Sequence, residues 1–285
     1  LPTYCPACGA TEGVTWTALT GDIGSAQLQG HYYLADETVD IGANHITVGT
    51  ANGQTLCVNL NGKTLTGGNA NGVFSMRTCV LNIMGNGSVT AGTSAGRVFN
   101  TNAGTINLYG GTFGVSTSTS RVVWTEGTGT VNMHAGTIDG TNGEFAVYLN
   151  KGATFNMEGG NVIGKRIYGD AGGATTTVTI NGGTVSGGLG VALSDLTVTG
   201  GTINQIDVAS DATVAISGKP AIAMLNLPDD YQITVGELVS GAVITVSADG
   251  VFTTDFASVE AAEAAKNFFL AADDGRIEVD GFALK

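Results

Sequence analysis

Three side chains at matching places in successive segments of this sequence could carry out acid–base chemistry. Tyr109, His134 and Glu158 each follow an apolar residue and precede a small Gly-rich stretch. If these segments stack as strands, the three side chains become neighbours about 4.8 Å apart, within reach of proton transfer. A glycosidase needs two carboxylates across the sugar, and neighbouring segments offer Glu158 no acidic partner. We therefore expect a solvated strand face, and keep catalysis by Tyr109, His134 and Glu158 as the alternative.

The sequence "CPACG", which begins at Cys5, has the spacing of half a zinc site. Two thiolates three positions apart, Cys5 and Cys8, can share one zinc ion. A complete site needs two further ligands, and the sequence holds no second Cys-x-x-Cys pair, although His31 and His45 are conceivable donors. We expect no cofactor and no metal, and keep a structural zinc ion at Cys5 and Cys8 as the alternative, beside a strained Cys5–Cys8 disulfide and free thiols.

The two remaining cysteines, Cys57 and Cys79, lie in adjacent segments. Aligning the segments pairs Cys57 with Val80 and Leu56 with Cys79. Because side chains alternate between the two faces of a strand, this alignment places the two thiols on opposite faces. It therefore argues against a disulfide between them.

An aromatic residue follows a β-branched residue in successive segments. The series is Phe74, Phe99, Trp124, Tyr148 and Tyr168. If the β-branched residues point inward, alternation turns the rings outward into a strip flanked by Arg97 and Arg166. Guanidinium groups bind hydroxyl and carboxylate oxygens, so the strip is a candidate glycan-binding surface. The alternative is a one-residue shift that buries the rings, Phe74 and Phe99 in particular.

A repeated unit positions all of these side chains. Segments such as "GTINLYGGTF" (104–113) and "GTVNMHAGTI" (129–138) recur from about residue 58 to residue 221, at intervals of about 18 to 25 residues. Each unit alternates apolar and polar residues, is rich in Val, Ile and Thr, and is punctuated by Gly, with no helical stripe. A fixed period of this kind indicates stacked units. We therefore predict an all-β solenoid with one short coil per repeat.

On these repeats the chain resembles the right-handed parallel β-helix proteins of the pectate-lyase-like superfamily. The resemblance covers residues 55–222. It implies an architecture but no activity, because that fold carries lyases, hydrolases, adhesins and tailspikes. The stretches "HYYL", "CVNLNGKTL" and "GVFTTDF" also look like parts of large surface proteins of gut Gram-positive bacteria.

The flanks divide the chain into three predicted parts. Residues 1–54 lack the Gly/Thr unit and are predicted to form an N-terminal cap with irregular first coils, residues 55–222 the β-helix, and residues 223–285 a small α+β cap. The cap includes one helix in "FASVEAAEAAKNFF", with Ser258 as its N-cap and Glu260 and Lys266 placed to suit the helix dipole. Such caps would cover the open ends of a solenoid.

Charge and hydropathy limit the range of functions. The net charge of −13 is concentrated in residues 1–59 and 201–285, whereas residues 60–200 are nearly neutral. An acidic chain is a poor match for nucleic acid, and no apolar run reaches the length of a membrane span. We expect a monomeric extracellular module, secreted or attached to a cell surface, whose signal and anchor would lie outside these residues. It would bind a polysaccharide or a host or bacterial surface glycan, or contact neighbouring domains of a larger protein. It could also act as a rigid spacer. The alternative function is that of a polysaccharide lyase or glycoside hydrolase.

Overall fold

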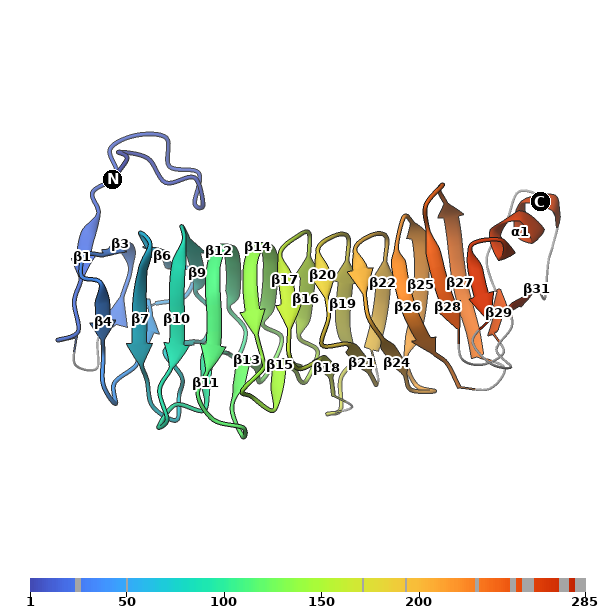
Figure 1. The fold of residues 1–285 in the computed structure, drawn as a ribbon. Helices are drawn as coiled ribbons and strands as arrows, with labels where there is room; N and C mark the ends of the chain where they lie inside the picture. Colours follow the sequence, from blue (N-terminus) through green and yellow to red (C-terminus); the bar gives the residue numbers. More distant parts are fainter. Residues whose placement is uncertain are drawn as a thin grey trace.

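The computed structural model describes residues 1–23, 27–49, 51–170, 172–192, 194–228, 231–246, 250–252, 259–271 and 277–279. Its strands stack side by side along one long axis, as a parallel β-solenoid whose successive coils advance from the N-terminal to the C-terminal end (Figure 1). The predicted parallel β-helix is confirmed.

The strands fall into three parallel ladders along the solenoid. The first ladder contains β1 (Thr17–Leu19), β3 (Gly30–Leu34), β6 (Thr55–Asn59), β9 (Val80–Met84), β12 (Thr105–Val115), β14 (Thr130–Asp139), β16 (Thr154–Met157), β19 (Thr176–Ile180), β22 (Ser194–Val198), β25 (Thr213–Gly218), β27 (Tyr231–Leu238), β29 (Gly250–Phe252) and β31 (Ile277–Val279).

Each strand of the second ladder comes next in the chain after a strand of the first ladder. It contains β4 (Thr38–Asp40), β7 (Lys63–Gly67), β10 (Gly87–Ala91), the C-terminal parts of β12 and β14, β17 (Asn161–Ile163), β20 (Thr184–Val185), β23 (Thr202–Ile203), β26 (Ala221–Asn226), β28 (Val243–Val246) and β30 (Phe269–Ala271).

The third ladder closes each coil and carries the predicted aromatic strip. It contains β2 (Gln27–Leu28), β5 (Ile46–Val48), β8 (Phe74–Met76), β11 (Arg97–Thr101), β13 (Arg121–Thr125), β15 (Phe145–Leu149), β18 (Ile167–Gly169), β21 (Leu189–Val191) and β24 (Ile206–Val208), which pairs with the end of β26.

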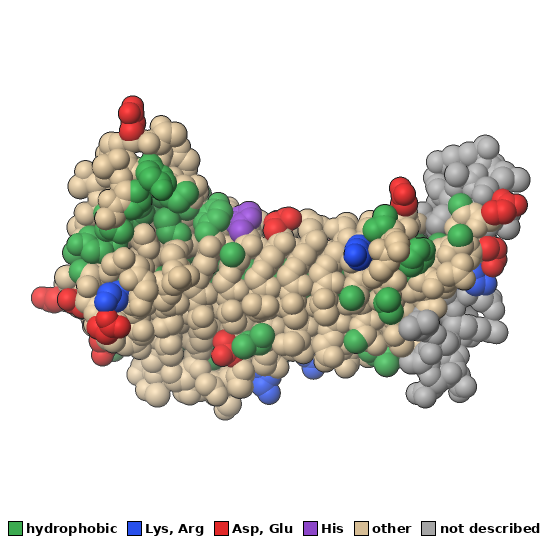
Figure 2. All heavy atoms as spheres, turned by 45° about the horizontal axis from the view of Figure 1, so that its top comes forward, with side chains coloured by type: hydrophobic (Ala, Val, Ile, Leu, Met, Phe, Trp, Pro, Cys, Tyr) green, Lys and Arg blue, Asp and Glu red, His purple; other side chains and the backbone are tan. Residues whose placement is uncertain are grey.

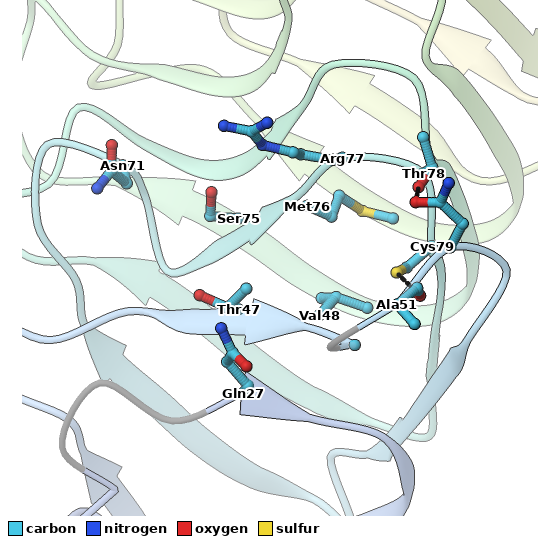
Figure 3. A pocket seen from close by; sticks show the side chains of 12 residues that line it. Gln27, Thr47, Val48, Ala51, Asn71, Ser75, Met76, Arg77, Thr78 and Cys79 are labelled. Atoms are coloured by element: carbon cyan, nitrogen blue, oxygen red, sulfur yellow. Dashed lines mark hydrogen bonds between the residues drawn. The ribbon is translucent and has the colours of Figure 1, made fainter.

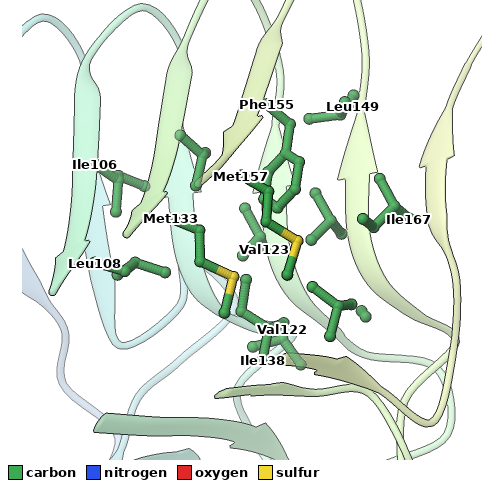
Figure 4. Close-up of a cluster of buried hydrophobic side chains, with 14 of the residues drawn as sticks. Ile106, Leu108, Val122, Val123, Met133, Ile138, Leu149, Phe155, Met157 and Ile167 are labelled. Atoms are coloured by element: carbon green, nitrogen blue, oxygen red, sulfur yellow. The ribbon is translucent and has the colours of Figure 1, made fainter. Parts of the chain in front are cut away.

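One apolar core fills the interior of the coils. Val131 and Phe155 are fully buried and paired in register, and so are Met133 and Met157. Figure 4 shows Met133, Met157 and Phe155 pointing into the same interior space. Long unbranched side chains such as Met fill irregular gaps, and burying each of these side chains contributes about 1.5–3 kcal/mol to folding.

The glycine of the repeated unit lies at a close contact between consecutive coils. Gly136 and Gly160 have φ angles of 94° and 83°. A Cβ at Gly136 would lie 2.6 Å from the carbonyl oxygen of Gly111, and a Cβ at Gly160 would lie 2.6 Å from that of Gly136. Only glycine combines a positive φ with this close approach, which explains why the fragment "GG" or "AG" recurs in coil after coil.

The C-terminal part differs in detail from the predicted small cap. The parallel ladders continue beyond residue 222 through β28, β30 and β31. The predicted helix is present as α1 (Val259–Lys266), with Glu260 in its first turn and Lys266 in its last. The predicted N-cap, Ser258, lies outside the described residues. Residues 223–279 therefore include an extension of the solenoid that carries a helix between two strands.

Candidate functional site

Three aromatic side chains lie in a row on the outer surface of the third ladder. Trp124, Tyr148 and Tyr168 are paired in register on β13, β15 and β18. All three are half-buried. The ring centroids of Trp124 and Tyr148 are 5.5 Å apart, and those of Tyr148 and Tyr168 are 5.8 Å apart. The predicted outward strip is thus present for these three residues.

The prediction was wrong for Phe99 and Phe74. Both are fully buried in the core, where their rings stack with centroids 5.8 Å apart. The ladder pairs Phe99 with Val123, and Trp124 with Asn100. The shift arises because the coil from β11 to β13 is one residue shorter than the step assumed in the sequence alignment. A one-residue slip exchanges the inner and outer faces.

Two arginines cover the ring of Trp124. The guanidinium carbons of Arg97 and Arg121 lie 4.1 Å and 4.3 Å from the ring centroid, within the range of favourable cation–π contact. Arg121, which the sequence analysis missed, also lies 5.2 Å from the ring of Tyr148. Arg121 could have been found from sequence by pairing it with Arg97, 24 residues earlier, as the structure does. The alignment used for the sequence was one residue off and did not pair them.

Phe145 and Arg166 extend the surface toward the C-terminal end. Phe145, also missed from sequence, stacks on Tyr168 with ring centroids 5.1 Å apart and lies 5.3 Å from Tyr148. The exposed Arg166 lies 5.8 Å from the ring of Tyr168 and 3.9 Å from a carboxylate oxygen of Asp207. We call this set the arginine–aromatic surface. Its members are Arg97, Arg121, Trp124, Phe145, Tyr148, Arg166 and Tyr168.

Acidic side chains balance the arginines around this surface. Arg97 pairs with Glu126 at 3.4 Å and Arg121 with Glu144 at 2.7 Å. The hydroxyl of Tyr148 donates a hydrogen bond of 2.6 Å to Asp170. Burial, together with this hydrogen bond and the charge of Asp170, raises the pKa of Tyr148 to about 12. The surface is therefore rich in polar groups without a strong net charge.

Three N–H donors beneath this surface have no acceptor among the described residues. They are Trp124 Nε1, Arg97 Nε and Arg121 Nε, and all three atoms are buried. An unpaired buried donor costs about 1–3 kcal/mol. The acceptor Asn100 Oδ1, opposite Trp124 in the ladder, is also buried without a partner, and because all of these atoms are buried a ligand would reach them only after the covering side chains move.

Shallow depressions flank the two ends of the arginine–aromatic surface. One has a volume of about 270 Å³ and is lined by Arg97, Thr117 and Ser120, among others. The other, of about 260 Å³, lies beside Arg166 and Tyr168. The surface thus extends over several coils along the solenoid axis.

Tyr109 and His134 of the predicted acid–base row are neighbours, as expected, but the row is not joined by hydrogen bonds into a catalytic group. The rings of Tyr109 and His134 stack with centroids 4.7 Å apart. The hydroxyl of Tyr109 donates to the carbonyl of Ala7 at 3.5 Å, and Glu158 accepts a hydrogen bond from Asn181 at 2.8 Å. The hydrogen bonds of Tyr109 and Glu158 therefore lead away from His134, as expected for polar side chains on a strand face.

Cys79 lies beside a separate cavity of about 420 Å³ between β5 and β8. Figure 3 shows Gln27, Thr47 and Val48 on one side of it and Arg77 and Cys79 on the other. The Cys79 thiol donates to the carbonyl of Ala51 at 3.2 Å. The cavity lining is neutral apart from Arg77, and offers no group suited to nucleophilic catalysis other than this hydrogen-bonded thiol.

The ladder also corrects the predicted alignment of Cys57. It pairs Cys57 with Asn82 and Leu56 with Leu81, two residues from the predicted register. Cys57 and Cys79 are both free thiols. The N-terminal pair, Cys5 and Cys8, lies instead beside Cys57 and His31.

No protein-family model, curated protein or solved structure matches the chain. Within the described residues, no helix has the length and apolar character needed to cross a membrane. The geometry of the chain's own side chains is therefore the basis for a functional proposal.

Proposed function

We propose that the chain is an extracellular binding module that contacts a polysaccharide through the arginine–aromatic surface. The observation that carries this proposal is the row of half-buried rings on β13, β15 and β18, flanked by the guanidinium groups of three arginines. Sugars offer apolar C–H faces to aromatic rings and many hydroxyl oxygens to N–H donors. Trp and Tyr combine an apolar body with a polar atom for this purpose.

The shape of the surface favours a chain-like ligand. Rings paired in register across β13, β15 and β18 form a row along the solenoid axis, and the two shallow depressions continue the row at its ends. A groove that follows several coils fits an extended polymer better than a compact small molecule, which would need a deeper enclosed pocket.

The local charges are consistent with a neutral or mildly acidic glycan. Each arginine of the surface has a carboxylate nearby, as in the Arg121–Glu144 pair. A carboxylate on the ligand could displace such a pairing, because arginine binds carboxylates through two parallel hydrogen bonds. The net charge of −13 weakens any attraction for nucleic acid.

Placement on a bacterial surface, secretion and the monomeric state are part of the same proposal. A solenoid built from short strands is a stiff scaffold that can display a binding surface away from an anchor. The rival activity, cleavage of the bound polysaccharide, would involve the Tyr109–His134 stack and Glu158.

A polysaccharide panel tests the proposal with tryptophan fluorescence as the readout. The chain has two tryptophans, so a Trp16→Phe background makes Trp124 the sole reporter. We expect binding of at least one polysaccharide to change the emission of Trp124 without releasing shorter sugars. In a parallel binding assay, Trp124→Ala and Arg121→Ala should weaken binding at least tenfold.

Tyr33→Ala serves as a matched control, because Tyr33 is a half-buried aromatic residue on β3, in the first ladder. Binding that Trp124→Ala and Arg121→Ala leave unchanged would overturn the proposed surface. Absence of binding across neutral and acidic polysaccharides would overturn the binding module in favour of a rigid spacer. Release of products that depends on His134 and Glu158 would establish the rival enzyme.

A further inference from the structure

Four side chains with metal-binding atoms converge where the N-terminal segment meets the solenoid. Two come from the segment itself, and the others from β3 and β6 of the first ladder. Their ligand atoms all lie within 4.8 Å of one another. We call them the cysteine–histidine cluster: Cys5, Cys8, His31 and Cys57.

The spacing within the cluster matches a tetrahedral metal site. With Zn–S bonds of about 2.3 Å and Zn–N bonds of about 2.0–2.1 Å, the edges of a zinc tetrahedron measure about 3.6–3.8 Å. The Cys8 sulfur lies 3.3 Å from His31 Nε2, and no pair in the cluster exceeds 4.8 Å. Shifts of a few tenths of an ångström to about one ångström would complete the coordination.

The segment around Cys5 and Cys8 folds into a turn suited to holding two sulfurs together. The N–H of Cys5 donates to the carbonyl of Ala10 at 2.8 Å, and the N–H of Gly9 donates to the carbonyl of Cys5 at 3.0 Å. Gly9 has a φ of 77°, which a residue with a side chain rarely adopts. The turn therefore needs glycine directly after the second cysteine.

Hydrogen bonds favour the anionic form of Cys8, whereas burial disfavours the anionic form of Cys5 and Cys57. Burial raises the pKa of Cys8, but hydrogen bonds with His31 and with the backbone of Ala10 lower it to about 7 overall. Burial raises the pKa of Cys5 and of Cys57. A divalent cation would offset that effect, because its charge stabilises thiolates directly.

A ladder of asparagines ends at the cluster. Asn107 donates to Asn82 at 2.8 Å, Asn132 to Asn107 at 2.8 Å, and Asn156 to Asn132 at 2.9 Å. Each amide donates toward the N-terminal end. The last donor, Asn82 Nδ2, lies 3.4 Å from Cys57 Sγ, so a sulfur accepts the final hydrogen bond of the ladder.

The strand register explains why the asparagine ladder ends at Cys57. His31 pairs with Cys57, and Cys57 pairs with Asn82, in the same column of the first ladder. The two coils that precede the asparagine ladder thus carry metal-ligating residues in place of asparagine. The nearby Asn59 lies outside this column, because the structure pairs it with Met84.

Half of the cluster is closed to solvent: Cys5 and Cys57 are buried, whereas His31 is half-buried and Cys8 is exposed. Cys5, Cys57 and Met84 form a small buried group outside the main core, with Val14 and Trp16 packed against it. The ring of Trp16 meets the ring of His31 edge-on at 5.3 Å. Figure 2 shows hydrophobic side chains gathered over this end of the molecule.

We propose that the cysteine–histidine cluster binds one zinc ion, which fastens the N-terminal segment to the first coils. Three thiolates and an imidazole select zinc over calcium or magnesium, which prefer oxygen ligands. Four protein ligands with tetrahedral spacing are typical of structural zinc sites, whereas catalytic sites keep an open position. The ion therefore stabilises structure and performs no chemistry.

Metal analysis of the 285-residue chain, purified without a metal-affinity tag, tests the proposal. We expect one zinc ion per chain after dialysis with zinc. Cys8→Ser and His31→Gln should each lower zinc affinity at least tenfold. The matched controls are Cys79→Ser and His45→Gln, because neither residue belongs to the cluster; both should retain the ion.

A spectroscopic readout separates this site from the proposed glycan surface. In a Trp124→Phe background, Trp16 beside His31 is the sole fluorescent tryptophan, and its emission should change when Zn²⁺ is added to the chelated protein. Cobalt substitution should give the visible absorption of tetrahedral thiolate ligation. Less than stoichiometric zinc, equal affinity in ligand and control variants, or a disulfide among the cluster cysteines in the purified protein would each overturn the proposal.

Discussion

The repeated coils and the N-terminal segment are held in place by different interactions. In residues 55–222 each coil is hydrogen-bonded to its neighbours through parallel ladders and buries side chains such as Phe155 and Met157 in a continuous core. In residues 1–16 hydrogen bonds such as that from Val14 N–H to the Thr3 carbonyl stay within the segment. The segment contacts the body through the cysteine–histidine cluster, a few apolar contacts and the hydrogen bond from the Tyr109 hydroxyl to the Ala7 carbonyl.

The difference shows that sequence repetition supplies stabilising contacts to the coils but not to the N-terminal segment. A coil in the middle of a solenoid finds a partner on either side, so its stability is largely a sum of equivalent neighbour contacts. A segment that lies against the outside of the stack has no such partner. It needs a cross-link of its own, and a metal ion bound only by the folded arrangement would provide one.

The largest expected effect comes from adding a side chain at a close contact between two coils of the body. Gly136→Ala forces a positive φ on alanine and places Cβ 2.6 Å from the Gly111 carbonyl oxygen. We expect a loss of about 2–4 kcal/mol in the free energy of unfolding, measured by denaturant titration. Zinc content of the folded protein should not change.

Gly114→Ala, on β12 of the preceding coil, is the matched control. A Cβ at Gly114 would lie 3.8 Å from its nearest neighbour, the Asp139 carbonyl oxygen. Stability should therefore change by less than about 1 kcal/mol. Equal losses for the two variants would contradict the assigned role of the glycine column.

A smaller effect is expected on zinc affinity, at the point where the asparagine ladder of the body meets the cysteine–histidine cluster. Asn82→Ala removes the hydrogen bond to Cys57 Sγ, and the loss of such a supporting contact lowers metal affinity about 10–100-fold. Asn132→Ala breaks the same ladder two coils farther on and should cost a similar ~1–2 kcal/mol of stability. It should leave zinc affinity unchanged, as judged by competition with a chromophoric chelator; an equal loss of affinity would refute the local role of Asn82.

The smallest predicted effect lies within the body and depends on pH. Tyr148 has a pKa of about 12 in the folded chain, against about 10 when unfolded. Its folded form retains the proton longer, so its contribution to stability is present below pH ~10 and disappears as the pH rises toward 12. Tyr148→Phe should make the decline of stability over this interval shallower, and an identical slope in the two proteins would contradict the assigned pKa.

The architecture could be predicted from sequence because the Gly/Thr unit repeats so regularly. Alternation within "GTINLYGGTF" identified strands, and the interval identified coils. The register could not be derived with the same certainty. The coil length varies, from 25 residues between the paired residues Thr105 and Thr130 to 24 between Thr130 and Thr154, and a bulge interrupts the pairing of β12 with β14 near Tyr109. A one-residue error was enough to place Phe99 outside the core and to overlook Arg121.

The cysteine–histidine cluster was only half visible in the sequence for a related reason. "CPACG" indicated two ligands, but the others depend on which residues the coils align. Matching Leu56-Cys57-Val58 with Leu81-Asn82-Ile83, by the order apolar–polar–apolar, would have placed Cys57 in the asparagine column. The alignment of Cys57 with Val80 instead separated Cys57 from these neighbours.

Hydrogen exchange followed by mass spectrometry, with zinc and with a chelator, tests the contrast between the two regions most directly. The account predicts that removing zinc strips protection from residues 1–16 while the coils of residues 65–222 keep theirs. The same loss in the N-terminal segment should appear in Cys8→Ser with zinc present. Protection of residues 1–16 that is indifferent to zinc, or a loss that spreads through the coils, would contradict it.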